Sequence, residues 1–168
     1  MILFGVNQPI YHNCIFINDL IISHNGDIWV ATDEEIYVFH DEILKEHFRK
    51  RDGVTIGIAN KLMLGLDNTI WVGSSEGVSH FDGEEWVGYK EEVGYTEEDG
   101  NTDYLHDMAI DPKGRVWVLT NSGLFSFDGT EWTDHKLKGY YTELEIDENG
   151  TVWLASDTLT KYIPAEAN

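Results

Sequence analysis

Short apolar stretches alternate with polar, turn-forming segments along the chain, and four of the apolar stretches are centred on a tryptophan. Polar residues rich in Asp and Asn precede each of the four, and in three of them a Gly stands just before the apolar stretch. The tryptophans are 36 to 46 residues apart. Such spacing is typical of a structural repeat with loops of variable length. The four tryptophans are Trp29, Trp71, Trp117 and Trp153.

The pattern inside each repeat predicts four short β-strands. The stretch around each tryptophan is rich in β-branched and aromatic residues, which favour strands. The Gly in the preceding turn supplies the positive φ that a tight hairpin requires. The second repeat lacks this Gly at 67–69, so we expect a tighter or rearranged hairpin there. A further apolar residue, ten positions after each tryptophan, predicts the third strand: Phe39, Phe81, Phe127 and Ile163.

Units of about 40 residues with four strands each are typical of β-propeller blades. The sequence therefore predicts an all-β chain in which residues 1–168 form a single small propeller of four blades, each of four antiparallel strands. The last repeat lacks a fourth strand, so we expect the apolar N-terminal residues 1–6 to complete it and close the ring. Residues 41–51 have the best helical pattern, yet they occupy a strand position and are predicted as strand plus loop. The blades are expected at about 18–50, 60–90, 104–138 and 141–163.

The third repeat carries the motif most clearly. Residues 111–120 read Asp-Pro-Lys-Gly-Arg-Val-Trp-Val-Leu-Thr, and residues 123–129 begin Gly-Leu and end Phe-Asp-Gly. This pattern resembles the two-component regulator propeller repeat, which is found in bacterial sensor ectodomains and related ligand-binding propellers. The resemblance extends over nearly the whole chain and implies the propeller fold. It also implies one possible role, that of a ligand-sensing propeller.

Acidic residues outnumber basic residues by 31 to 11, and the formal net charge is −20. A field of this sign repels phosphate backbones and anionic lipids, which argues against nucleic acid and membrane partners. The single cysteine, Cys14, cannot form an intrachain disulfide, and the N-terminus lacks the pattern of a signal peptide. We therefore expect a soluble cytoplasmic protein, monomeric or homodimeric. A secreted or periplasmic chain trimmed of its signal remains the alternative.

The predicted topology brings the loop after each tryptophan strand to one face of the propeller, which we call the top face. A hydroxyl residue recurs at the start of these loops. Hydrogen bonding within the loop or to the neighbouring blade is its simplest role. The loops nevertheless form a candidate binding surface, made of Thr32, Asp33, Ser74, Ser75, Thr120, Asn121, Ser156 and Asp157.

The longest connection between blades, residues 90–104, is also predicted on the top face and holds six carboxylates and two tyrosines. Long loops on a rigid scaffold commonly carry function, and this composition suits a basic or polyhydroxyl partner. A solvated acidic loop without a partner is the alternative. Residues 45–51 hold four of the eleven basic residues and form a second candidate contact. The candidate binding residues of the long loop are Glu91, Glu92, Tyr95, Glu97 and Tyr104.

Aromatic residues and histidines are further candidates for a functional site. The four repeat tryptophans lie among apolar neighbours, so packing between blades is favoured over sugar stacking. Trp86 and Trp132, on outer strands, are expected to be more exposed. The histidines lack the spacing of a metal site, and no nucleophile elbow, P-loop or dinucleotide motif occurs. We expect no metal, no cofactor and no catalytic residue.

These observations favour a non-enzymatic binding module that presents its top-face loops to a protein or peptide, with a basic partner favoured by the net charge. Three alternatives stay open at this point. The first is a glycan-binding, lectin-like propeller, and the second is a propeller lyase or hydrolase. The third is a ligand-sensing propeller related to two-component sensor ectodomains.

Overall fold

The computed structural model describes residues 16–54, 57–95 and 104–164 and folds them into four antiparallel sheets of consecutive strands. The first sheet contains β1 (Ile17–Ile22), β2 (Ile28–Thr32), β3 (Ile36–His40) and β4 (Ile43–Phe48). The second contains β5 (Ala59–Leu64), β6 (Ile70–Ser74), β7 (Gly77–Phe81) and β8 (Trp86–Tyr89). The third contains β9 (Leu105–Ile110), β10 (Val116–Thr120), β11 (Gly123–Phe127) and β12 (Trp132–Asp134). The fourth contains β13 (Glu143–Ile146), β14 (Val152–Ala155) and β15 (Leu159–Tyr162).

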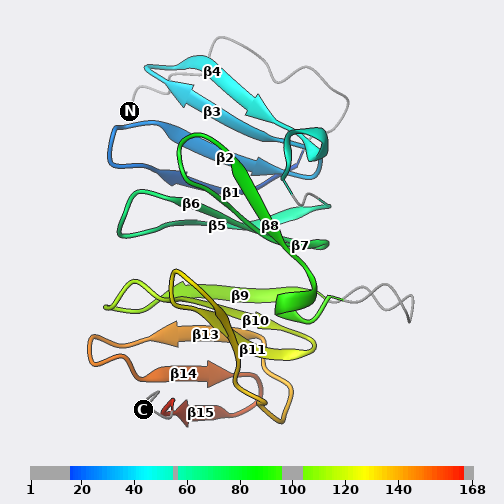
Figure 1. The fold of residues 1–168 in the computed structure, drawn as a ribbon, viewed down its shortest axis with the longest axis vertical. Coiled ribbons are helices and arrows are strands. Elements are labelled where there is room, and N and C mark those ends of the chain that lie inside the picture. The colour runs from blue at the N-terminus through cyan, green and yellow to red at the C-terminus, as the bar shows by residue number, and fades with distance from the viewer. Residues whose placement is uncertain (1–15, 55–56, 96–103, 165–168) are drawn as a thin grey trace.

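The four sheets follow one another in chain order along the longest axis of the molecule, with β1–β4 at one end and β13–β15 at the other (Figure 1). Their first strands are neighbours, since β1 contacts β5, β5 contacts β9 and β9 contacts β13. This is the arrangement of successive propeller blades. The residues predicted to complete the fourth blade, 1–6, lie outside the described ranges, so closure of the ring stays a prediction.

The segment with the best helical pattern, residues 41–51, forms mainly a strand. It contains β4 and then enters a single 3-10 turn, η1 (Lys50–Asp52). A second 3-10 turn, η2 (Glu91–Val93), follows β8 at the corresponding place in the next sheet. The prediction of a strand plus a loop is therefore confirmed, and the helical pattern is confined to one turn.

The hairpin between the first two strands of each sheet has the same turn in all four repeats. In the second repeat the amide of Asn68 donates to the carbonyl of Gly65, as the amide of Gly114 donates to that of Asp111 in the third. Asn68 adopts a φ of 71°, against 85° for Gly114. Asn tolerates this left-handed conformation better than most residues do. The expectation of a tighter or rearranged hairpin in the second repeat was therefore wrong.

The fourth sheet departs from the other three in its register. Val152 of β14 pairs with Tyr162, whereas the corresponding Val116 pairs with Phe127, so the intervening loop is one residue shorter. Tyr162 therefore occupies the third-strand position at which the sequence predicted Ile163. Ile163 lies beyond the strand and is 71% exposed. A loop deletion shifts every later side chain by one position, which the constant spacing of the first three repeats did not reveal.

Aromatic and aliphatic side chains between neighbouring sheets form the core. Trp29 stacks on Phe48 and also contacts Trp86 of the second sheet, at a ring distance of 6.3 Å. Trp71 makes the equivalent contact with Trp132 of the third sheet, also at 6.3 Å. Trp117 is fully buried in the cluster shared with the fourth sheet. Each of these tryptophans thus packs toward the next sheet in the chain, where it removes a large apolar area from water.

Trp153 is the repeat tryptophan of the last sheet and is only half-buried. Its indole nitrogen donates to Asp147 at 3.2 Å, and the ammonium of Lys161 lies over its ring. The other three tryptophans face a following sheet. Trp153 is instead stabilised by contacts within its own sheet.

Carboxylates of the first strands tie neighbouring sheets together. Asp19 accepts from the amide of Leu62 at 2.8 Å, and Asp107 accepts from the amide of Leu144 at 3.0 Å. Lys61, at the corresponding place in β5, pairs with Asp107 at 2.7 Å. These bonds cross from one sheet to the next and satisfy polar groups at the inner edge of the sheets. They add a directional contact to the apolar packing.

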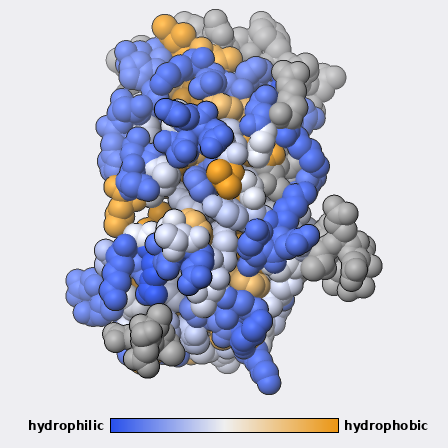
Figure 2. Space-filling view, viewed as in Figure 1, coloured by the Kyte–Doolittle hydropathy of each residue, from blue (hydrophilic) through white to orange (hydrophobic). Residues whose placement is uncertain are grey.

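The surface is mainly hydrophilic, with hydrophobic side chains gathered chiefly toward the end occupied by the first sheet (Figure 2). Ile22 and Ile43 of that sheet are 63% and 65% exposed. Within the described residues, no helix is long and apolar enough to cross a membrane.

Candidate binding groove

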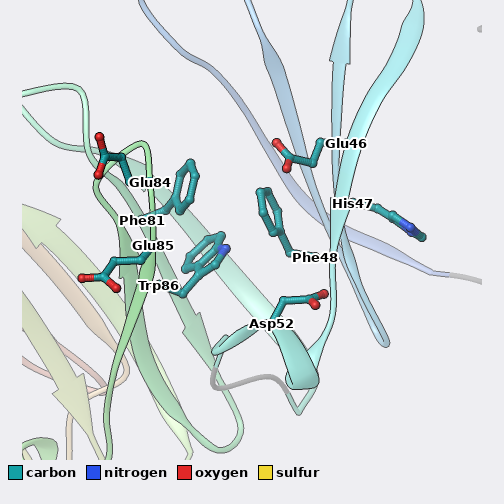
Figure 3. A pocket seen from close by; sticks show the side chains of 8 residues that line it. All are labelled: Glu46, His47, Phe48, Asp52, Phe81, Glu84, Glu85 and Trp86. Atoms are coloured by element: carbon teal, nitrogen blue, oxygen red, sulfur yellow. The ribbon is translucent and has the colours of Figure 1, made fainter.

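A groove of about 440 Å³ lies between the outer strands of the first two sheets (Figure 3). One wall comes from the end of β4 and the turn η1 that follows it. The other wall comes from the end of β7, the β7–β8 turn and the start of β8. Aromatic residues and carboxylates together form its lining, which consists of Glu46, His47, Phe48, Asp52, Phe81, Glu84, Glu85 and Trp86.

Three aromatic rings form the floor of the groove. The ring centres of Phe48 and Phe81 are 5.2 Å apart, those of Phe48 and Trp86 are 5.3 Å apart, and those of Phe81 and Trp86 are 5.1 Å apart. Trp29 lies beneath them and stacks on Phe48 with an interplanar angle of 5°. These distances fit favourable offset and edge-to-face pairs. The floor is therefore held in place by the same packing that joins the two sheets.

The β7–β8 turn places two carboxylates on the rim. Asp82 accepts hydrogen bonds from the amides of Glu84 and Glu85 at 2.9 and 3.0 Å, and Gly83 takes a φ of 107°. These backbone hydrogen bonds favour the charged form and lower the pKa of Asp82. The turn is therefore fixed by Asp82, which leaves the side chains of Glu84 and Glu85 exposed beside the aromatic floor.

Trp86 carries a buried polar group within the floor of the groove. The residue is 9% exposed, and its enclosed indole N–H has no hydrogen-bond partner among the described residues. Figure 3 shows the indole between the two walls, facing Phe48. A buried donor without an acceptor costs free energy, and the packing of the aromatic rings has to offset that cost.

Behind the opposite wall, a buried carboxylate organises the end of β4. Glu35 is 7% exposed and accepts from His47 at 2.8 Å and from the guanidinium of Arg49. Burial alone would raise the pKa of Glu35, but the hydrogen bonds from Arg49 and His47 outweigh it and hold the pKa below its ordinary value. Burial and the charge of Glu35 raise the pKa of the neighbouring Tyr37 to about 12. Arg49 and His47 are thereby engaged by Glu35.

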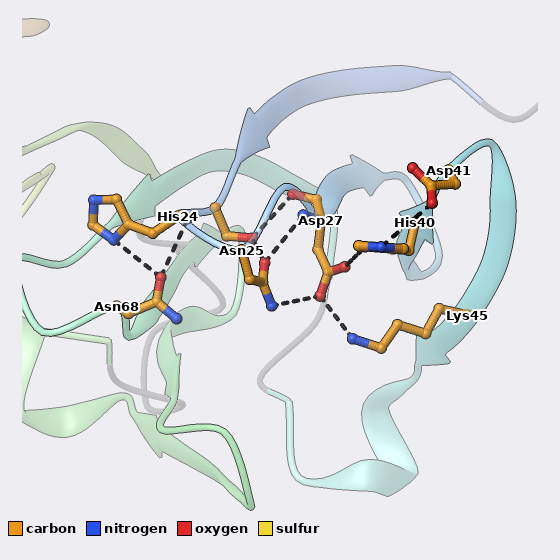
Figure 4. Close-up of polar contacts among 8 residues, drawn as sticks. His24, Asn25, Asp27, His40, Asp41, Lys45 and Asn68 are labelled. Carbon is orange, nitrogen blue, oxygen red and sulfur yellow. Dashed lines mark hydrogen bonds and ion pairs between the residues drawn. The ribbon is translucent and has the colours of Figure 1, made fainter.

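A second polar cluster surrounds Asp27, on another part of the first sheet (Figure 4). Its carboxylate pairs with Lys45 and His40, both at 2.7 Å, and accepts from Asn25 at 2.9 Å. Burial opposes ionisation, but the hydrogen bonds from Lys45 and His40 lower the pKa of Asp27. Asn68, from the turn of the next sheet, accepts from the amide of His24 at 3.3 Å. The cluster is matched within itself and ties two turns together, which is a structural role.

Three of the recurrent hydroxyls predicted on the top face donate to backbone carbonyls, two within their own turns and one to the turn η2. Thr32 is buried and its hydroxyl donates to the carbonyl of Glu35 at 2.6 Å. Ser74 donates to the carbonyl of Gly77 at 3.1 Å, in the equivalent turn. Thr120 is buried as well and donates to the carbonyl of Val93 at 3.3 Å.

The other predicted residues of these loops make local or neighbouring contacts. Asp33 accepts from Asn18 at 2.9 Å, Ser75 accepts from the amide of Ile58 at 3.0 Å, and Asn121 lies 2.7 Å from His106. Ser156 is exposed and donates to the adjacent Asp157 at 3.1 Å. The contacts are spread over the four sheets, and no cavity described for the structure is lined by these residues.

The long connection between the second and third sheets contributes partly to the core. Tyr95 is 8% exposed, packs with the core between these sheets, and donates its hydroxyl to the carbonyl of Ser74 at 2.8 Å. Glu91 and Glu92 belong to η2 and are exposed, and Tyr104 is 53% exposed. Glu97 lies outside the described residues.

Sequence reasoning did not identify the groove as a site. It placed Trp86 on an outer strand and expected it to be more exposed than the repeat tryptophans, but Trp86 is buried because the first sheet packs against it. The available signal was local: the run Gly-Glu-Glu-Trp at 83–86 joins two carboxylates to an aromatic residue. Its partner wall is some 35 residues away in the chain, so spacing alone could not bring the two together.

No metal-binding group of three or more His, Cys, Asp or Glu residues occurs in the described part of the chain. Neither a family model nor a curated protein matches the sequence. Solved structures do match. The extracellular domain of a hybrid two-component system from B. thetaiotaomicron has a TM-score of 0.70 and 19% identity over 89% of this chain. The fold is that of propeller blades.

Two further structures share this architecture. Virginiamycin B lyase from Staphylococcus aureus, solved in an inactive form with quinupristin, has a TM-score of 0.65 and 11% identity over 90% of this chain. PorZ of Porphyromonas gingivalis, a surface component of the type-IX secretion system, has a TM-score of 0.59 and 18% identity over 88% of this chain. The chain spans 22% of the two-component ectodomain, 57% of the lyase and 26% of PorZ. The resemblance to the two-component propeller repeat is thus confirmed for the fold.

Proposed function

We propose that this chain is a non-enzymatic binding module that uses an acidic surface to bind a positively charged protein or peptide. The observation that carries this proposal is the excess of 31 acidic over 11 basic residues. The buried carboxylates Asp27, Glu35 and Asp111 are matched by bases within the fold. The unmatched negative charge therefore lies mainly on the surface, where it attracts cations and steers a basic partner.

The similar structures support a proposal about the cellular location of the chain. Proteins described as extracellular domains or surface components share its fold, which favours a location outside the cytoplasm over the cytoplasmic one expected from the sequence. Because a two-component ectodomain and a lyase also share this fold, a ligand-sensing role and a lyase role stay as alternatives. A carbohydrate ligand is the remaining alternative.

A fluorescent oligolysine peptide tests the proposal directly. We expect saturable binding that weakens as salt is raised, because exposed charges are screened over about 10 Å at 0.1 M salt. A peptide of the same length with every lysine acetylated serves as the matched control and is expected not to bind. Equal binding of the two peptides, or no binding at low salt, would contradict the proposal. Specific capture of glycans on an array would favour the lectin alternative instead.

A further inference from the structure

We propose that the groove between the first two sheets is where a lysine or arginine side chain of this partner binds, with its cation among the rim carboxylates and its stem on the aromatic floor. This inference rests on the proposed function and assigns it to one place.

The rim carboxylates lack a cation within the described structure. Glu46, Glu84 and Glu85 are exposed, and none of them forms an ion pair with a described base. Bases are nearby in the sequence, at 45–50, but they are directed elsewhere. Three carboxylates around one groove repel one another, and a bound cation relieves that repulsion.

Three bases beside the groove whose side chains the structure describes each pair with a carboxylate outside it. Lys45 contacts Asp27 at 2.7 Å and Lys50 contacts Glu76 at 2.5 Å. The guanidinium of Arg49 pairs with Glu35. These three cations are therefore engaged by carboxylates other than Glu46, Glu84 and Glu85.

The aromatic floor suits the stem and the cation of such a side chain. Lysine and arginine have long apolar stems that pack on apolar surface while the charged end stays near water. A cation within about 6 Å of an aromatic ring is also attracted by the ring's negative face. Phe81 is half-buried, and its ring centre lies 5.2 Å from that of Phe48 and 5.1 Å from that of Trp86, so part of the floor is open to the groove.

The aromatic floor also distinguishes a peptide side chain from a bare metal ion. A metal ion would use only the carboxylates, whereas a lysine or arginine side chain uses the carboxylates and the rings. The indole N–H of Trp86 is enclosed within the floor and, like that of Trp132, belongs to the shared aromatic framework.

The corresponding contact between the second and third sheets, which we call the second interface, shows that the scaffold does not require these carboxylates. It repeats the aromatic residues, with Tyr89 packed 5.1 Å from Trp132 and 5.5 Å from Phe127. The indole N–H of Trp132 is also unpartnered among the described residues. The positions of Glu46, Asp52, Glu84 and Glu85 are taken there by Val87, Val93, Thr130 and Glu131. Only the groove at the first interface combines the aromatic floor with an acidic rim.

The test compares two variants that remove the same charge from different places. Glu46→Gln, Glu84→Gln and Glu85→Gln are combined in the groove variant. The control variant combines Glu143→Gln, Glu145→Gln and Glu148→Gln, three exposed residues of the fourth sheet region. We expect the groove variant to bind oligolysine about tenfold more weakly and the control about as tightly as the parent protein, since three exposed ion pairs together account for a change of that size. Thermal unfolding of both variants, expected to match the parent, shows that they are folded.

A second pair of variants locates the bound peptide. Trp86→Phe and Trp132→Phe each remove one indole N–H and thereby assign its NMR signal. In an NMR titration with oligolysine, the indole N–H signal that disappears in Trp86→Phe is expected to shift, and the signal assigned through Trp132→Phe is expected to stay.

The outcomes separate the site from the function. If oligolysine binds the parent protein but both charge variants lose the same affinity, the general field explains binding, and the groove assignment is overturned while the proposed function stands. If oligolysine does not bind the parent protein, both fail. If Mg²⁺ alone shifts the Trp86 indole signal as strongly as oligolysine does, the site recognises cations without a peptide, and the assignment to a side chain is overturned.

Discussion

The first two interfaces between neighbouring sheets share an aromatic framework and differ in charge. In both, a tryptophan of the outer strand contacts the repeat tryptophan of the preceding sheet at 6.3 Å. The groove at the first interface carries four carboxylates around that framework, and the second interface carries one at the same positions. The shared part follows from the need to bury apolar area between sheets. The charge has no such structural cause. The aromatic rings are therefore the scaffold, and the carboxylates are what marks the first interface as a candidate site.

The largest expected effect concerns the framework. Phe48 is 8% exposed, whereas Tyr89, its counterpart at the second interface, is half-buried. We expect Phe48→Ala to lower the free energy of unfolding by about 3–4 kcal/mol, as is typical for removing a buried ring, and Tyr89→Ala to lower it by about half as much. Urea denaturation followed by circular dichroism measures both. Equal losses would mean that the two frameworks contribute equally to stability.

A smaller effect concerns the buried charge behind the groove. Glu35 has its counterpart in Gly77 of the second sheet, so only the first sheet carries a carboxylate there. We expect Glu35→Gln to cost about 2 kcal/mol at neutral pH, because Arg49 and His47 lose their charged partner. Urea denaturation over a range of pH measures this loss.

The pH dependence of that effect has a definite sign. The folded-state pKa of Glu35 lies below its ordinary value of 4.5, so its contribution to stability is present above pH 4.5 and is lost as the pH falls through the folded-state pKa. The difference between the parent protein and Glu35→Gln is therefore expected to shrink on acidification. A difference that stayed constant down to strongly acidic pH would show that ionised Glu35 does not contribute. Glu143→Gln, at an exposed position, is the control and is expected to change little at any pH.

The smallest expected effect comes from transferring the acidic rim to the second interface. Val87→Glu and Thr130→Glu together place carboxylates at the positions of Glu46 and Glu84. We expect this double variant to gain a second oligolysine site, so that the stoichiometry of binding doubles at a cost in stability below about 1 kcal/mol. Calorimetric titration measures the number of sites. An unchanged stoichiometry would show that an acidic rim on this framework is not sufficient.

Much of the fold could be predicted from the sequence because its signals are local. The alternation of apolar and turn residues predicted the strands, and β4 formed where a helical pattern competed with a strand position. The failures were of two kinds. Asn68 replaced a Gly in the left-handed position, which sequence rules treat as an exception. A loop shortened by one residue moved Tyr162 into the place predicted for Ile163.

The candidate site was less predictable, for a different physical reason. The top-face hydroxyls are regular in sequence because each caps its own turn, as Thr32 and Ser74 do. Regularity in a repeat thus reflects the needs of the scaffold. The acidic rim occurs at only one of these two interfaces, and it is assembled from two sheets. A feature that departs from the repeat carries no periodic signal.

The sequence by itself determined the repeat, the strands and their turns, the tryptophans at the heart of each unit, and a strongly negative charge. These depend on residues a few positions apart, whose backbone preferences and apolar spacing act locally. Only the tertiary structure decided which carboxylates lie beside aromatic rings, which bases pair with buried carboxylates, and which indole N–H groups have no acceptor among the described residues. Those properties depend on the packing of one sheet against the next, which joins residues such as Phe48 and Trp86 that are distant in the chain.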